Sequence, residues 1–120
     1  MKMSLTATKI WVANDPVDFR KAVNGLTEII ADSVSEATQG LIEDGIYVFY
    51  NRAKNKLKLL ARHRNGVVLI YKRLDKKHFT LKANVAEMYE ITEQQLAWLL
   101  AGLDWVNMSE WEELTPQDYY

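Results

Sequence analysis

The chain contains no cysteine, so disulfide bonds, thiolate catalysis and zinc sites built on sulfur are all excluded. Its two histidines, His63 and His78, lie within residues 52–78, where Asp75 is the only acid, and this is a poor ligand set for a metal. We therefore expect surface histidines, no metal and no cofactor. No window approaches the roughly 20 apolar residues that a membrane span needs, and the N-terminus lacks the apolar run of a signal peptide. These absences predict a soluble cytoplasmic protein with no membrane partner.

The two signs of charge are segregated along the chain, although the formal net charge at pH 7 is only −1. Residues 1–51 hold four Lys or Arg against seven Asp or Glu, and residues 84–120 hold eight Asp or Glu and no Lys or Arg. Residues 52–78 hold ten Lys or Arg against a single Asp. The net charge is therefore a poor guide to the surface, and the central segment should carry a strong positive field.

Length and periodicity predict a single α+β domain over residues 1–106, followed by an acidic, aromatic tail over residues 107–120. Each connection in the middle of the chain is too short for a crossover, so we expect an antiparallel sheet of about four strands. Asn65-Gly66 is a strong signal for a two-residue turn within it. The expected strands lie at 10–13, 45–52, 56–62 and 67–74, with a further short one at 78–81.

The first of two expected helices should run from Pro16 to about Val34. Asp15 would be its N-cap, and Asp18 would lie in its first turn, where a carboxylate favours the positive end of the helix dipole. Catalysis is the alternative role for these two carboxylates. We prefer capping, because no spacing in the chain suggests the convergent carboxylates of a metal-dependent nuclease.

The second helix should run from Ile91 to Trp105, with Thr92 and Gln95 as a capping box. Asp104 lies near its end, where a negative charge is unfavourable, so we expect Asp104 to pair with a cation of the sheet. Both helices are expected to pack on one face of the sheet, leaving the other face open.

The basic segment interleaves its cations with aromatic residues, which suits nucleic acid because phosphates attract cations and rings stack on bases or sugars. Lys72 and Arg73 are adjacent and point to opposite faces, so one of them should lie on the helix-covered side, paired with an acid. A solvated face that blocks edge-to-edge association is the alternative, but the absence of any acid from residue 56 to 73 favours an anionic partner. The candidate nucleic-acid-binding residues are Arg52, Lys54, Lys56, Lys58, Arg62, Arg64, Lys72 and Arg73.

A series of short motifs spans most of the chain, from Trp11 to Trp105. In order they are VDFRK at 17–21 with Gly25-Leu26, VF at 48–49, NR at 51–52, KLKLL at 56–60, Gly66, YKRL at 71–74 with Phe79, and LLAGLDW at 99–105. The ordered set resembles TnpB, the small accessory protein from the second open reading frame of the insertion sequence sixty-six family of bacterial transposable elements. In place of an acidic stretch usual in that family, this chain has Arg62-His63-Arg64-Asn65. The family-motif residues singled out are Asp18, Arg20, Gly25, Gly66, Asp104 and Trp105.

The resemblance implies an accessory factor for transposition that is separate from the transposase and is not an enzyme. Our leading hypothesis is DNA binding through the basic sheet surface, and the alternative is a module that docks the transposase without binding DNA. The pair of Asp18 and Arg20 has either a functional role or a structural one, as a helix start with an ion pair. The tail either solubilises the chain or folds onto the basic surface and competes with DNA, through its acids Glu110, Glu112, Glu113 and Asp118.

Overall fold

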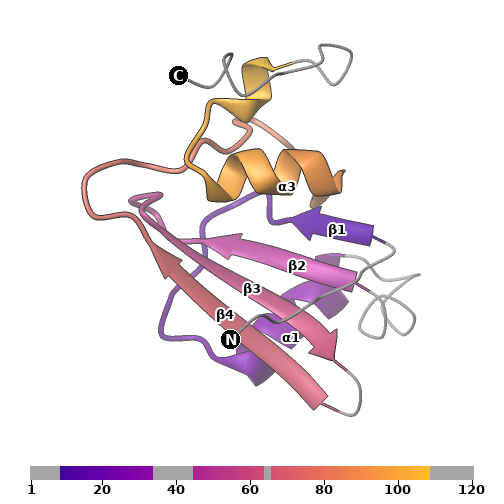
Figure 1. The fold of residues 1–120 in the computed structure, drawn as a ribbon. Coiled ribbons are helices and arrows are strands. Elements are labelled where there is room, and N and C mark those ends of the chain that lie inside the picture. The colour runs from indigo at the N-terminus through magenta and orange to yellow at the C-terminus, as the bar shows by residue number, and fades with distance from the viewer. Residues whose placement is uncertain (1–8, 34–44, 64–65, 109–120) are drawn as a thin grey trace.

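The structure is a computed structural model that describes residues 9–33, 45–63 and 66–108 (Figure 1). It confirms the α+β class. Asn65, Arg64 and the acidic tail from residue 109 onward lie outside the described residues, as do the predictions made for them. The elements are β1 (Lys9–Val12), α1 (Val23–Ser33), β2 (Gly45–Tyr50), β3 (Lys56–His63), β4 (Gly66–Arg73), β5 (Tyr89–Ile91), α3 (Glu93–Leu100) and the 3-10 helix η1 (Trp105–Asn107).

The sheet has five strands in the order β4-β3-β2-β1-β5 and is mixed. The meander β2-β3-β4 is antiparallel, as predicted, with Phe49 opposite Lys58 and Lys58 opposite Tyr71. However, β1 runs parallel to β2, because the long connection between them contains α1 and has room for a crossover. The prediction of a purely antiparallel sheet of about four strands was therefore wrong.

Two short segments also differ from their predictions. Residues 78–81 form no strand, although Phe79 and Leu81 are buried there. The fifth strand is instead β5, which pairs antiparallel with β1. A strand of three residues is too short to show the alternation by which strands are recognised in a sequence.

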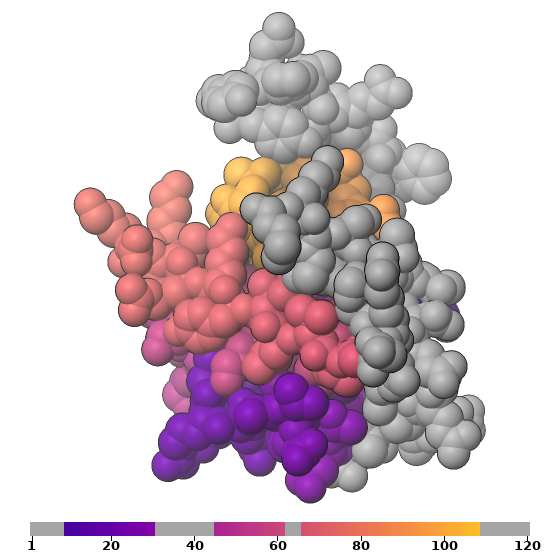
Figure 2. All heavy atoms as spheres, turned by 60° about the horizontal axis from the view of Figure 1, so that its bottom comes forward, coloured from indigo at the N-terminus to yellow at the C-terminus, as the bar shows by residue number. Residues whose placement is uncertain are grey.

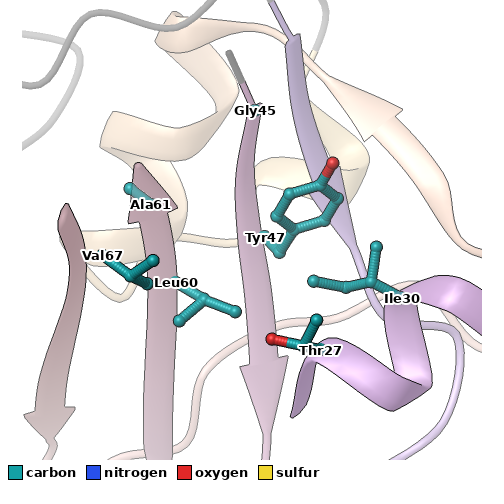
Figure 3. A pocket seen from close by; sticks show the side chains of 7 residues that line it. All are labelled: Thr27, Ile30, Gly45, Tyr47, Leu60, Ala61 and Val67. Atoms are coloured by element: carbon teal, nitrogen blue, oxygen red, sulfur yellow. The ribbon is translucent and has the colours of Figure 1, made fainter. Parts of the chain in front are cut away.

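The two helices cover opposite faces of the sheet, which corrects the prediction that they share one face. Figure 3 shows Thr27 and Ile30 of α1 facing Tyr47 and Leu60, which lie opposite each other on β2 and β3. The other face carries Lys72, whose ammonium group donates a hydrogen bond of 2.6 Å to the carbonyl oxygen of Leu100 in α3. The crossover places α1 on one face, and the apolar residues of the other face need a cover of their own, which α3 supplies.

Helix α1 begins at Val23, seven residues later than predicted, and ends at Ser33, close to the predicted end. The chain before it runs along the end of β2, where the N–H of Val17 donates to the carbonyl oxygen of Tyr50. Asp18 does not cap the helix. Its carboxylate instead accepts a hydrogen bond from the backbone N–H of Arg20, in a tight turn. The first turn of α1 contains no acid, so the capping role predicted for the two aspartates was wrong.

The capping box predicted at the start of α3 is present, with Thr92 and Gln95 exchanging side-chain and backbone hydrogen bonds. The helix ends at Leu100 rather than at residue 105. Gly102 has φ of 78°, its N–H donates to the carbonyl oxygen of Leu99, and the next N–H along, that of Leu103, donates to Trp98. This is a Schellman motif, which ends helices at a glycine because the left-handed conformation carries no Cβ penalty there.

Candidate nucleic-acid interface

Three segments far apart in the sequence meet at the end of the sheet where β2 turns into β3. We name this region, residues 15–21, 51–56 and 73–78, the basic corner. Residue 17 is hydrogen-bonded to the last residue of β2, as described above. On the other side of the turn, the N–H of Leu74 donates to the carbonyl oxygen of Asn55, and the N–H of Phe79 donates to that of Lys54. Hydrogen bonds between backbones therefore hold all three segments together.

The loop between β2 and β3 is organised by the side chain of Asn51. Its Oδ1 accepts hydrogen bonds from the backbone N–H groups of Asn55 and Lys56, at 3.1 and 3.0 Å, and its Nδ2 donates to Oδ1 of Asn55 at 2.7 Å. Lys54 adopts φ of 59°, a left-handed conformation that is uncommon for a residue with a side chain. The loop is thus built by its own hydrogen bonds, and it holds Arg52 and Lys54 at the end of the sheet.

Asp18 and Arg20 form a bidentate ion pair on the opposite wall of the corner. Nη2 of the guanidinium lies 2.7 Å from Oδ2, and Nε lies 3.0 and 3.1 Å from the two carboxylate oxygens. Hydrogen bonds from the side chain and backbone of Arg20 lower the pKa of Asp18 to about 2. The Arg20 side chain is 92% exposed, so the carboxylate fixes a guanidinium that faces solvent. Between the two walls lies an open groove, lined by Pro16, Val17, Asp18, Phe19, Asn51, Arg52 and Ala53.

Positive charge dominates the basic corner, which contains eight Lys or Arg against three Asp. Across the described ranges the ion pairs are two, Arg20 with Asp18 at 2.7 Å and Arg73 with Asp75 at 3.6 Å. The remaining cations of the corner have no carboxylate within ion-pair distance among the described residues. They are Lys21, Arg52, Lys54, Lys56, Lys76 and Lys77.

The structure divides the residues that the sequence put forward for nucleic-acid binding. Arg52, Lys54, Lys56 and Arg73 lie in the basic corner. Lys58 borders the corner, but its ammonium group is already engaged, because it donates to the carbonyl oxygens of Phe19 and Lys21 at 2.7 and 3.0 Å. The Arg62 and Arg64 side chains are not among the described ones.

Lys72 lies on the face away from Lys58, under the end of α3. One of Lys72 and Arg73 was expected on a helix-covered side, paired with an acid. Lys72 has that place, but its partner is the carbonyl oxygen of Leu100, in the last turn of a helix where a cation also favours the dipole. The residue with an acidic partner is Arg73, on the other face.

Four cations of the corner were not predicted from the sequence as interface residues: Arg20, Lys21, Lys76 and Lys77. The signal for Lys76 and Lys77 was present, because they continue the basic segment. Arg20 and Lys21 lie about thirty residues before it, and only the crossover from β1 to β2 brings them to the corner. His78 also joins the corner, with its Nδ1 at 2.7 Å from the carbonyl oxygen of Ala53.

Two of the family-motif residues have structural roles at the other end of the chain. Trp105 is 1% exposed, and its indole N–H donates to the carbonyl oxygen of Thr80. Asp104 accepts a hydrogen bond of 2.7 Å from Nδ2 of Asn107 and pairs with no sheet cation in the described part of the chain, so its predicted ion pair was wrong. The end of LLAGLDW thus supplies a buried core residue, Trp105, and an acceptor for a local hydrogen bond, Asp104.

The fold and this corner define a small mixed-sheet α+β domain with one cation-rich end. None of the helices within residues 9–33, 45–63 and 66–108 combines the length and the apolar character of a membrane span. Residues 8–110 match the family described as IS66 Orf2 like protein, and the chain belongs to that family. Membership indicates an accessory role associated with transposition.

Two curated relatives come from Sinorhizobium fredii (strain NBRC 101917 / NGR234). The uncharacterized protein y4jC is 27% identical over 104 residues, which cover 83% of each chain. The uncharacterized protein y4hO is 28% identical over 103 residues, which cover 85% of this chain and 86% of the relative. No solved structure is significantly similar to this chain.

Proposed function

We propose that this protein is a non-enzymatic accessory factor for DNA transposition that works in the cytoplasm and binds the DNA backbone through the basic corner. The observation that supports the proposal is the group of six corner cations with no carboxylate partner among the described residues, two of which are Arg52 and Lys77. Lysines elsewhere on the sheet, such as Lys58 and Lys72, are instead engaged by backbone carbonyl groups.

The arrangement favours phosphates over bases. The cations belong to three separate segments of the corner, and of them Arg52 lines the open groove. Direct base readout instead needs an element that enters a groove of the duplex. Arg20 is not one of the six, because its guanidinium is already paired with the carboxylate of Asp18. We therefore expect DNA binding with low sequence preference and a strong dependence on salt.

The test is the affinity for duplex DNA over a series of salt concentrations. Arg52 and Lys77 are both exposed. The residue after each, Ala53 and His78, are in contact, because Nδ1 of His78 lies 2.7 Å from the carbonyl oxygen of Ala53. Arg52→Ala and Lys77→Ala should each reduce the slope of log affinity against log salt by about 0.9, the value for one phosphate contact. Lys9→Ala is the matched control, because Lys9 is exposed and lies opposite Gly45, at the other end of β2 from the corner. Equal slopes for all three variants and the unaltered chain would refute the proposal.

The alternative partner is the transposase of the same element. If the chain has no measurable affinity for DNA but co-purifies with the transposase after nuclease treatment, the basic corner is a protein-docking surface. Arg52→Ala and Lys77→Ala should then weaken that co-purification, and Lys9→Ala should not.

A further inference from the structure

The outer side of β4 is an edge of the sheet, with β3 on its inner side and no described strand on its outer side. The strand is eight residues long, GVVLIYKR, and contains neither proline nor an acid. Short length, proline and inward charges are the devices that normally keep an edge strand from pairing with another chain. The two cations of β4 lie at its end, and both are turned to other partners, Lys72 to α3 and Arg73 to Asp75. Within the described residues, the middle of the edge therefore has none of these devices.

The backbone direction at this edge follows from the ladder with β3. The N–H of Leu74 donates to the carbonyl oxygen of Asn55, in the same register that pairs Arg73 with Lys56. Hydrogen-bonded pairs alternate along an antiparallel ladder, so the even-numbered residues of β4 bond to β3. The N–H and C=O groups of the odd-numbered residues, Val67, Leu69 and Tyr71, consequently point outward from the edge.

Two of these three odd-numbered residues carry the large exposed apolar side chains of the sheet. Val67 is 43% exposed and Tyr71 is 52% exposed, and the third large exposed hydrophobic of the described chain, Val106, lies in η1. Both β4 side chains project from the face that α1 partly covers, since Tyr71 is opposite Lys58 and its ring meets that of Phe19 edge-on. Figure 2 shows the pink-to-coral atoms of β3 and β4 lying against the indigo atoms of the region around α1.

We infer that this edge binds a second copy of the chain, strand β4 against strand β4, antiparallel and centred on Leu69. In that register Val67 of each copy lies opposite Tyr71 of the other, so each exposed side chain covers the other in an aromatic–β-branched pair. The outward N–H and C=O groups of residues 67, 69 and 71 bond to their counterparts, and the two sheets join into one.

Charge also favours the antiparallel orientation of the second copy over a parallel one. Antiparallel pairing places the positively charged end of each strand, Lys72 and Arg73, at the opposite end from that of the other copy. A parallel pair would bring these cations side by side, where like charges destabilise a sheet. The inference does not depend on DNA binding, because the residues it uses at the centre of the edge lie outside the basic corner.

The first measurement is the mass of the nuclease-treated protein in solution over a range of concentrations, by sedimentation equilibrium. We expect a dimer at the higher concentrations. Val67→Lys should raise the dimer Kd by about tenfold or more, because it removes both cross-strand pairs and places a charge on the edge. Val106→Lys is the matched control, an equal change at an exposed valine away from β4, and it should leave the Kd unchanged.

The register is tested by disulfide cross-linking. The chain has no native cysteine, so any cross-link must come from the introduced cysteines. Val67→Cys and Tyr71→Cys are prepared as separate proteins. Opposed residues have Cα atoms about 5.5 Å apart, within reach of a disulfide, whereas residue 67 of one copy lies about 14 Å from residue 67 of the other. Oxidation should therefore link a mixture of the two proteins and neither protein alone. A monomer at every concentration, equal effects of the two lysine variants, or no excess cross-linking in the mixture would overturn the inference.

Discussion

The side chain of Lys58 fastens the segment before α1 to the sheet through Phe19. Its Nζ lies 2.7 Å from the carbonyl oxygen of Phe19 and 4.8 Å from the centroid of that residue's ring. The same ammonium group reaches the carbonyl oxygen of Lys21 at 3.0 Å. A lysine of the basic segment is thus a structural connection between parts of the chain 37 and 39 residues apart, and it positions the turn that carries Arg20.

The first prediction concerns this lysine. Lys58→Met keeps most of the apolar stem and removes the donor, so it should lower the free energy of unfolding by about 1–2 kcal/mol, as expected for hydrogen bonds from a charged group that are partly exposed. The matched control is Lys56→Met, two residues away on the same face of β3, where we expect a change of about 0.5 kcal/mol or less. Urea unfolding measures both. Equal destabilisation by the two changes would show that the contacts of Lys58 contribute nothing.

The elements that could be predicted from the sequence are those set by short, local patterns. Alternating side chains predicted the meander β2-β3-β4, and the Thr92–Gln95 capping box predicted the start of α3, because both patterns are complete within a few residues. The start of α1 was wrong for a specific reason. An aspartate followed by proline and a second aspartate is typical of a helix start, but Asp18 satisfies its carboxylate with Arg20, two residues on.

The features that could not be predicted from the sequence depend on contacts between residues far apart in the chain. The parallel pairing of β1 with β2 decides that α1 takes one face and leaves the other to α3. The same pairing brings Asp18 and Phe19, the residues just before Arg20, into one groove with Arg52, so two separate stretches of the chain form one corner. The basic segment predicted that cations would gather. It could not predict that Lys58 is bound by backbone carbonyl groups while Lys56 has no carboxylate partner among the described residues, because this depends on which groups the fold brings within reach.

The second prediction is the titration of Asp18. Its pKa should be near 2 by NMR, below the ordinary value of 3.8, because Arg20 donates hydrogen bonds to the carboxylate. A lowered pKa means that the pair stabilises the fold above pH 3.8 and that this contribution is lost as the pH falls through about 2. The effect on overall stability should be small, since the pair is exposed and screened by solvent.

Two variants separate the causes of this shift. Arg20→Ala should raise the pKa of Asp18 toward 3.8, although the remaining backbone N–H of residue 20 keeps it slightly lower. Lys21→Ala should change it little, because Lys21 contributes only through its charge and is the smallest of the causes. If the pKa of Asp18 stayed the same in Arg20→Ala, the bidentate pair would not exist in solution.

The third prediction compares two glycines. Gly102→Ala should destabilise the protein by about 1 kcal/mol, because residue 102 has φ of 78° and L-residues with a Cβ pay that cost in the left-handed region. The added methyl group itself would meet only Leu74 Cδ1, at an ordinary contact distance of 3.8 Å. Gly66→Ala is the control, since a Cβ there meets nothing within 4 Å. Residue 66 lies in a strand, and alanine loses less conformational entropy than glycine when the chain folds. Gly66→Ala should therefore be neutral or slightly stabilising, and thermal unfolding of both variants decides the matter.

The fourth prediction is a loss of stability at alkaline pH that follows from buried tyrosines. Burial raises the pKa of Tyr89 from 10.0 to about 12, and burial also raises the pKa values of Tyr47 and Tyr50. Tyrosines whose pKa is higher in the folded state than in the unfolded state give a stability that is complete below pH 10 and is lost as the pH rises toward 12.

The ultraviolet absorbance of tyrosinate should therefore rise in two steps, and the later step should coincide with the loss of near-ultraviolet circular dichroism. In urea all six tyrosines should titrate together near their ordinary value. Tyr89→Phe should diminish the later step. A single step near pH 10 in the folded protein would show that these rings are not buried in solution.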